Sequence, residues 1–278
     1  MPTIKKILFP LDFSDRCAGA GRYVESFAGR FQAEIMLLHA VDRGAHAPAE
    51  ELRPGRERQL ASFMTGELKQ FVTQRVCRLG EPGAIIAETA RTWWPDLVMM
   101  PTHGMGLYDR LMLGSVTARM LAELDCPLWT DVHSDVAPAL EAIHCRKVLC
   151  AVDLSYRNRR VLEWASFLAT EYQAELAVLH AIPDKVAVAA GQTQFRETAG
   201  SAFTHARNQI DALQTAVGMS GSAYVEAGDP AEVAARTARQ LGADLLVVGR
   251  HEARGVYEHL HQHLYSIVCE SPCPVLSI

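Results

Sequence analysis

The chain has 278 residues, of which 49% are hydrophobic and 21% are charged, and its formal net charge at pH 7 is −5. This length predicts about two globular domains, and a negative net charge without a Lys/Arg cluster argues against a nucleic-acid partner. No run of 18 apolar residues occurs, so no membrane-spanning helix and no membrane partner are expected.

The first half of the chain alternates apolar runs with helical patterns. A strand is predicted over residues 5–11, directly at an N-terminus without a signal-peptide cleavage pattern. With seven cysteines and no CxxC pair, this favours a cytoplasmic protein with reduced thiols. Ser14 is a candidate N-cap for a helix that runs to Phe31. The later elements are a strand over 34–41, a weak helix over about 49–70 interrupted at Pro54-Gly55, a strand over 72–79, a helix over 82–94, a strand over 96–100, a helix over 116–124 and a strand over 128–132.

The second half of the chain repeats the first. Residues 6–14 match 147–155 and residues 33–40 match 174–181, both with the same offset, and three later segments match in the same order. Ordered matches of this kind indicate a tandem duplication. Strands that alternate with helices predict a parallel α/β sheet covered on both faces. We therefore predict two doubly wound, five-stranded, mainly parallel domains at residues 1–134 and 144–278, joined by a linker over 133–144 and packed as a pseudo-two-fold pair.

A glycine-bearing loop follows the predicted strand over 96–100. Gly104 and Gly106 would let the loop backbone approach an anion, and Gly114-Ser115 opens the next helix. The first N–H groups of a helix lack internal partners and lie at the positive end of its dipole, so this pattern favours a phosphate site. The two common phosphate loops, GxxxxGK[ST] and GxGxxG, are absent. From the loop alone, a simple turn explains the glycines equally well.

These segments together resemble the universal stress protein family. The first half carries PLDFS at residues 10–14, LHAV at 38–41, GEP at 80–82 and CP at 126–127. Gly104 and Gly114-Ser115 fit the spacing of the family's nucleotide motif, G-x2-G-x9-G-[ST]. The resemblance covers nearly the whole chain as two tandem domains. It implies an adenine nucleotide α-hydrolase-like fold and pairing of the domains through their fifth strands.

The resemblance also implies a ligand. In ATP-binding members, the Asp after the first strand and the backbone after the second-strand His contact adenosine, and the glycine loop and helix start hold the phosphates, usually with a divalent cation. This implies ATP, with or without Mg²⁺, in the first domain only. The residues that would contact it are Pro10, Asp12, Ala40, Met100, Pro101, His103, Gly104, Gly114, Ser115 and Val116.

Two residues of this set, and one histidine near it, can also be explained without a bound nucleotide. Pro101 stands where the family motif has its first glycine, and a proline has no N–H to donate, so one phosphate contact would be lost. Asp12 could equally organise the turn after the first strand. His39 returns as His180 in the second half, which favours a structural role for both.

The second half departs from the motif. Glu252 takes the place of the second glycine, and His261-Gln262 take the place of Gly114-Ser115. A carboxylate about 4 Å from a phosphate costs about 1 kcal/mol in water and about 4 kcal/mol at an effective dielectric constant of 20, so we predict no ATP there. His259 and His263 are four residues apart and could share a helix face as zinc ligands. Because no third ligand is evident, we expect a filled polar pocket rather than a metal site at His251, His259, His261 and His263.

The interpretation is a regulatory adenine-nucleotide-binding protein with intramolecular domain pairing, which also allows a homodimer. No nucleophile–base pair and no paired carboxylates support catalysis. Two alternatives stay open. One is an interaction or small-ligand scaffold without nucleotide, which Pro101 and the second loop favour. The other is a weak ATP hydrolase of the same fold. An SGGxDS-type first loop would favour it, and the chain has LDFS at residues 11–14 instead.

Overall fold

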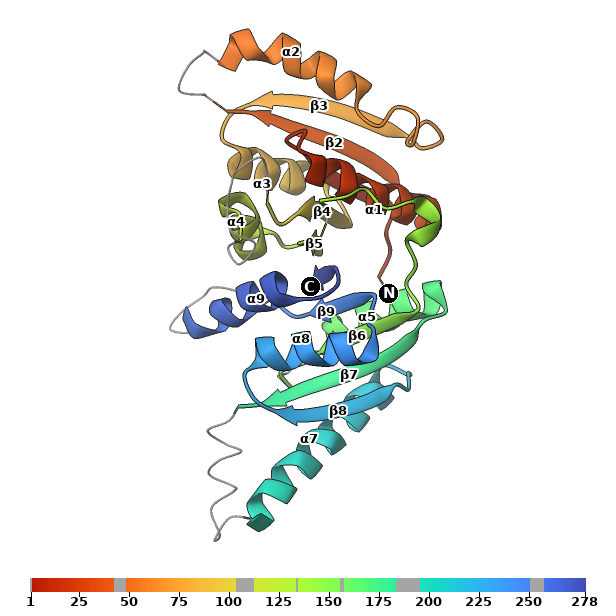
Figure 1. Cartoon of the computed structure of the whole chain (residues 1–278), viewed down its shortest axis with the longest axis vertical. Coiled ribbons are helices and arrows are strands. Elements are labelled where there is room, and N and C mark those ends of the chain that lie inside the picture. Colours follow the sequence, from red (N-terminus) through yellow and green to blue (C-terminus); the bar gives the residue numbers. More distant parts are fainter. Residues whose placement is uncertain are drawn as a thin grey trace. The chain divides into compact units, whose positions relative to one another are not determined.

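The computed structural model describes residues 2–42, 49–103, 113–133, 135–155, 158–183, 196–250 and 258–278. Of residues 49, 196–199 and 258–262 it describes the backbone only. The chain divides into two compact units, Thr3–Ile143 and His144–Ile278 (Figure 1).

The first unit is a parallel sheet with strand order β3-β2-β1-β4-β5. Helix α1 contacts β1 and β4, whereas α3 contacts β2 and lies beside α4. This is the doubly wound arrangement that the alternating pattern predicts. Its elements are β1 (Lys6–Pro10), α1 (Asp15–Phe31), β2 (Glu34–Val41), α2 (Ala49–Ser62), β3 (Thr73–Leu79), α3 (Pro82–Trp93), β4 (Leu97–Pro101), α4 (Ser115–Glu123), β5 (Leu128–Asp131) and the short 3₁₀ helix η1 (Leu140–Ala142).

The second unit repeats this topology, with the parallel order β10-β9-β6-β7-β8. The predicted duplication of a five-stranded α/β domain is therefore confirmed, and the pairing of the two domains stays a prediction. The elements of the second unit are β6 (Lys147–Ala151), α5 (Asn158–Tyr172), β7 (Glu175–Ile182), α7 (Arg196–Ala216), β8 (Ser222–Ala227), α8 (Pro230–Leu241), β9 (Leu245–Val248), α9 (Glu258–Glu270) and β10 (Val275–Ser277).

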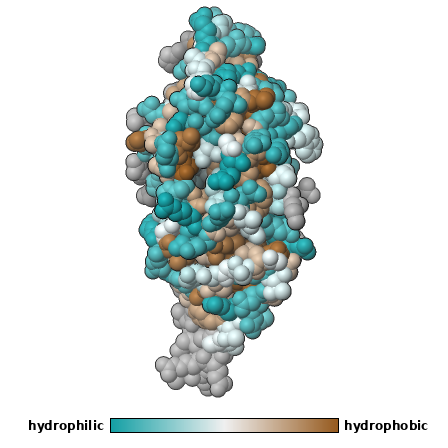
Figure 2. Space-filling view, turned by 90° about the vertical axis from the view of Figure 1, so that its right-hand side faces the viewer, coloured by the Kyte–Doolittle hydropathy of each residue, from teal (hydrophilic) through white to brown (hydrophobic). Residues whose placement is uncertain are grey.

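Apolar strands form the core of each unit. Every residue of β4 and of β9 is buried, as expected for parallel strands with helices on both faces. On the face shown in Figure 2, hydrophilic side chains are interspersed with smaller apolar areas, which is ordinary for a folded domain. Within the described part of the chain, no helix has the length and apolar character needed to cross a membrane.

The turns of the two units use equivalent residues. Gly80 and Gly228 both have φ of 143°, a conformation that favours glycine. Each is followed by an acidic N-cap, Glu81 for α3 and Asp229 for α8, whose carboxylate accepts hydrogen bonds from two backbone N–H groups of the first turn. A proline then occupies the first helical position, where its missing N–H costs nothing.

Helix α2 differs from the prediction in two ways. It runs through Pro54-Gly55 without interruption, because residues 50–55 are all exposed and water can hydrate the carbonyl that Pro54 leaves unbonded. It also ends at Ser62 rather than near residue 70. Met64 adopts a left-handed φ of 51°, which does not continue a right-handed helix.

Part of the predicted linker belongs to the first unit. Asp135 accepts a hydrogen bond from Arg16 Nε, and the carbonyl of Pro138 accepts one from Arg22 Nε at 3.3 Å. Both arginines lie on α1. Residues 135–143 therefore lie against this helix before the second unit begins.

Candidate functional site

The residues predicted to bind a ligand lie at the carboxyl ends of β1 and β4. From β1 the chain crosses to β2 on one side, and from β4 it crosses to β5 on the other side. In doubly wound sheets, ligands bind at such a switch point. Asp12 follows β1, Pro101–His103 end and follow β4, and Ala40 lies near the end of the neighbouring β2.

The start of α4 packs directly against the end of β4. Gly114 donates its N–H to the carbonyl of Thr102 at 3.0 Å. A Cβ added to Gly114 would lie 2.9 Å from that carbonyl oxygen, so this position requires glycine for close approach rather than for an unusual φ. Thr117 Oγ1 also donates to the carbonyl of Pro101 at 3.2 Å.

Helix α4 has no side-chain cap. Gly114 occupies its N-cap position, and the first turn contains no acidic residue. By contrast, α1, α3 and α8 are capped by the side chains of Ser14, Glu81 and Asp229. Ser115 is exposed, and the first backbone N–H groups of α4 can therefore receive an external anion.

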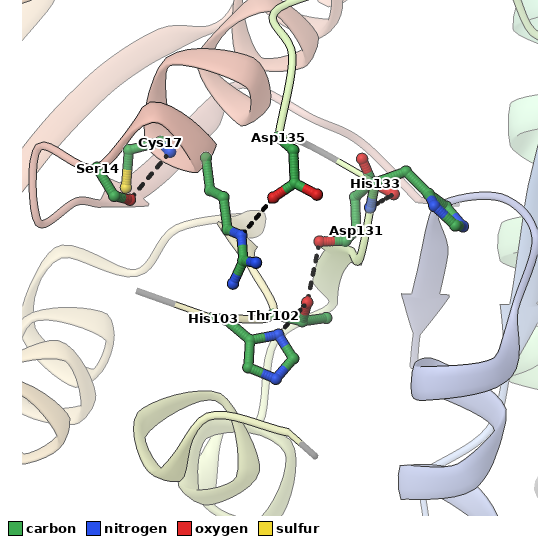
Figure 3. Close-up of polar contacts among 8 residues, drawn as sticks. Ser14, Cys17, Thr102, His103, Asp131, His133 and Asp135 are labelled. Atoms are coloured by element: carbon green, nitrogen blue, oxygen red, sulfur yellow. Dashed lines mark hydrogen bonds and ion pairs between the residues drawn. The ribbon is translucent and has the colours of Figure 1, made fainter. Parts of the chain in front are cut away.

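A chain of hydrogen bonds fixes the side chain of His103. Thr102 Oγ1 donates its single hydrogen to the carbonyl of Asp131 at 3.2 Å, so it accepts the hydrogen of His103 Nδ1, 3.0 Å away (Figure 3). His103 Nε2 then carries a lone pair. The side chain is only 5% exposed, and no described residue forms a hydrogen bond with Nε2. Burial, and secondarily the charge of Arg16, lower the pKa of His103 and favour its neutral form.

Asp12 organises the turn after β1. Its Oδ1 accepts hydrogen bonds from the Ser14 N–H at 3.0 Å and from the Cys17 thiol at 3.1 Å. Burial and the nearby Asp12 charge raise the pKa of Cys17 to about 12, which keeps the thiol protonated as a donor. In the second unit, Asp153 Oδ1 accepts from the Ser155 N–H and from Asn158 Nδ2, at 2.9 and 2.6 Å. The turn-forming role of this Asp is thus present in both units.

His39 and His180 also have the same role. Nδ1 of His39 donates to the carbonyl of Leu11 at 2.8 Å, and Nδ1 of His180 lies 2.9 Å from the carbonyl of Val152. Each histidine ties the second strand of its unit to the chain that leaves the first strand. The structural interpretation of this pair is supported.

The structure places the predicted phosphate-binding residues that it describes close together. Pro101, His103, Gly114, Ser115 and Val116 form one neighbourhood at the ends of β4 and α4. Pro10 and Met100 are buried strand residues without a polar side-chain atom for a ligand. Gly104 lies outside the described residues.

Two residues close to this neighbourhood could not be predicted as part of the site from the sequence. Arg16 lies in the first turn of α1, and its Nε donates to Asp135 Oδ1 at 2.6 Å. Asp135 belongs to a stretch that was predicted to be a linker. Only the folded arrangement shows that the two side chains meet beside the ends of β1 and β4.

The equivalent helix in the second unit begins earlier. Aligning Cys126 with Cys273 matches the last residues of α4 and α9, Glu123 and Glu270. However, α9 has 13 residues and α4 has 9, so its N-terminus lies about 6 Å farther along the helix axis. The first residue of α9 is Glu258, an acidic residue where an anion would need N–H donors.

The histidines of the second unit do not form a metal site within the described residues. His263 is partly exposed, and its Nδ1 lies 3.4 Å from Asp229 Oδ2. No group of three His, Cys, Asp or Glu side chains in the described ranges is placed to hold a metal ion. His251 and the side chains of His259 and His261 lie outside the described part, so the prediction of a filled pocket is not tested for them.

Comparisons with known proteins agree with the duplication. The model of the universal stress protein family matches residues 3–130 and 144–278. Universal stress protein MJ0577 of Methanocaldococcus jannaschii is 26% identical over 153 residues, which cover 45% of this chain and 92% of the relative. YxiE of Bacillus subtilis is 28% identical over 144 residues, covering 48% and 97%. The crystal structure of a universal stress protein from Archaeoglobus fulgidus shares the fold across 98% of this chain and 97% of its own, with a TM-score of 0.77 at 18% identity.

Proposed function

The chain belongs to the universal stress protein family, and we propose that it is a cytoplasmic regulatory protein whose first unit binds an adenine nucleotide, ATP with or without Mg²⁺, and whose second unit does not. The observation that carries this proposal is the uncapped start of α4 at the switch point of the first sheet. All seven cysteines are free thiols, which supports a reducing compartment.

The phosphates would bind at the start of α4. The backbone N–H groups of Ser115 and Val116 and the Ser115 hydroxyl are the donors, and the positive end of the α4 dipole adds to them. The buried Nε2 of His103 has no hydrogen-bond partner among the described residues, and its lone pair would accept a hydrogen bond from a hydroxyl or water of the bound ligand rather than contact a phosphate oxygen. If Mg²⁺ is present, the phosphates and water would supply most of its oxygen ligands.

The adenosine would lie toward β1 and β2. Ala40 is half-buried near the end of β2, where its backbone can face a base. Asp12 Oδ1 already accepts two hydrogen bonds from its own turn. We therefore assign Asp12 to shaping this side of the site and leave base recognition mainly to the backbone.

The second unit lacks the main phosphate feature. The extra turn of α9 displaces the N–H groups that α4 offers, and Glu258 brings a negative charge to the new helix start. Repulsion between this charge and a phosphate supports a unit that does not bind ATP.

A scaffold without nucleotide is the second candidate, and Pro101 is the observation that favours it. The missing N–H removes one charged hydrogen bond, worth about 1.5–3 kcal/mol. Such a loss weakens binding by about ten- to over a hundredfold, but it leaves the donors of α4 in place.

Titration calorimetry with Ser115 variants separates these two candidates. Ser115 is exposed, and an acidic residue in the first turn favours the α4 dipole, so Ser115→Asp should fold normally. A carboxylate beside the phosphates should raise the free energy of ATP binding by about 1–4 kcal/mol. The neutral isostere Ser115→Asn should bind ATP much more tightly than Ser115→Asp. Equal affinities of the two variants, or no ATP binding by the wild-type protein, would refute the proposed site.

A further inference from the structure

Arg16 has unused donors close to the start of α4. Its guanidinium offers five N–H groups in a planar fork. Asp135 accepts the Nε hydrogen at 2.6 Å, and no described residue accepts a hydrogen bond from the two terminal nitrogens. The Arg16 side chain is 22% exposed, so these nitrogens can be reached from solvent.

Arg16 is held by Asp135, in the segment that follows β5, and lies close to His103. The Arg16 charge lies near enough to the imidazole to lower its pKa, with burial as the larger cause. His103 in turn adjoins Gly114, because a Cβ at Gly114 would lie 3.6 Å from the His103 Cα. Figure 3 shows His103, Thr102, Asp131 and Asp135 at this end of the first unit, and the dashed line at Asp135 marks its bond to Arg16. A cation from α1 and the N-terminus of α4 therefore border the same place.

A second observation indicates that this place receives a ligand. His103 is only 5% exposed, yet its Nε2 has no hydrogen-bond partner among the described residues. A buried polar atom is costly to leave without a hydrogen-bond partner. Because Nε2 carries a lone pair, the partner that it takes is a hydrogen-bond donor of the ligand, such as a hydroxyl or a bound water, and not a phosphate oxygen. Because Nδ1 is held by Thr102, the ring cannot turn to satisfy Nε2 without breaking another bond.

We propose that Arg16 is a phosphate ligand of the first unit, whose terminal nitrogens bind the phosphate chain of the nucleotide together with the start of α4. This inference rests on the proposed function and adds a side-chain ligand to it. The guanidinium fork fits two phosphate oxygens at once, so Arg16 compensates for the backbone donor that Pro101 lacks. Asp135, from the segment that follows β5, holds the guanidinium by its Nε and leaves the fork open.

The test compares three ligands on two arginine variants of the full chain. Calorimetry measures the binding of ATP, pyrophosphate and adenosine to the wild-type protein, Arg16→Gln and Arg22→Gln. Arg22 is a matched control, because it lies on the same helix and its Nε bonds the carbonyl of Pro138 in the same segment. We expect Arg16→Gln to weaken ATP and pyrophosphate by about ten- to a hundredfold, to leave adenosine unchanged, and to differ from Arg22→Gln, which should bind all three ligands normally.

The possible outcomes separate this inference from the proposed function. If Arg16→Gln binds ATP as tightly as the wild type, the inference is wrong and the nucleotide site stands. If pyrophosphate binding depends on Arg16 but ATP binds no more tightly than pyrophosphate, the inference about Arg16 is supported and the proposed adenosine site is wrong. An equal loss for adenosine would show a general structural role, and absence of both ATP and pyrophosphate binding would overturn both proposals. If Arg16→Gln does not fold, Arg16→Lys keeps the charge without the fork and should show an intermediate loss for ATP and pyrophosphate alone.

Discussion

At the scale of single residues, the duplication separates structural from ligand-binding roles. Asp12 and Asp153 each accept a hydrogen bond from the N–H of the serine two residues later, and His39 and His180 bond equivalent backbone carbonyls. Roles that persist in a unit without the glycine motif are required by the fold. This comparison supports the turn-forming interpretation of Asp12, and contact of Asp12 with a ligand stays a prediction.

The buried histidines of the first unit make its stability depend on pH. Burial lowers the pKa of His39 and of His103 below their ordinary value of 6.5. Around and below pH 6.5 the unfolded chain therefore binds more protons at these residues than the folded chain does. Their contribution is fully present above pH 6.5 and is lost as pH falls toward the lowered pKa values.

We therefore expect the melting temperature to fall between pH 7.5 and pH 5.5, and His39→Gln to reduce that fall. Gln can still donate a hydrogen bond to the Leu11 carbonyl but cannot titrate. Thermal melts across this range, compared between the two proteins, make the measurement. A variant that keeps the full pH dependence of the wild type would contradict the assignment to His39.

At the scale of elements, the long segments with apolar periodicity could be predicted from the sequence, whereas some helix ends and the contacts between distant residues could not. The bounds of β2 and α1 follow from apolar periodicity and from the Ser14 cap. The end of α2 depends on a backbone conformation at Met64, and the early start of α9 depends on residues that lack both a cap signal and apolar periodicity. The start of α4 could be predicted from Gly114-Ser115. Arg16 could not, because its partner Asp135 is 119 residues away in the chain.

Replacement by alanine should change the stability of the protein in opposite directions at Gly114, the N-cap of α4, and at Gly55, inside α2. A methyl group at Gly114 would lie 2.9 Å from a backbone carbonyl, whereas one at Gly55 in α2 would meet nothing within 4 Å. Gly114→Ala should therefore lower the free energy of unfolding by about 1–3 kcal/mol. Gly55→Ala should raise it by about 0.5–1 kcal/mol, because Ala loses less backbone entropy in a helix. Urea denaturation of both variants tests this, and a stabilised Gly114→Ala would show that the α4 start is not tightly packed.

At the scale of the whole molecule, one fold is present twice, and the helices α4 and α9 begin at different positions in the two copies. The two units share their topology, their glycine turns and their acidic N-caps. They differ where α4 and α9 begin. The duplication therefore preserved the structure of the domain, and the proposed phosphate site lies where the two copies differ.

The stoichiometry of ATP binding tests this account most directly. Titration of the full chain, freed of any nucleotide that purifies with it, should give one ATP per chain, and Ser115→Asp should weaken that single binding event by about 1–4 kcal/mol, as expected for a carboxylate beside the phosphates. Two ATP molecules per chain, or one that Ser115→Asp leaves unchanged, would contradict the assignment of the nucleotide to the first unit.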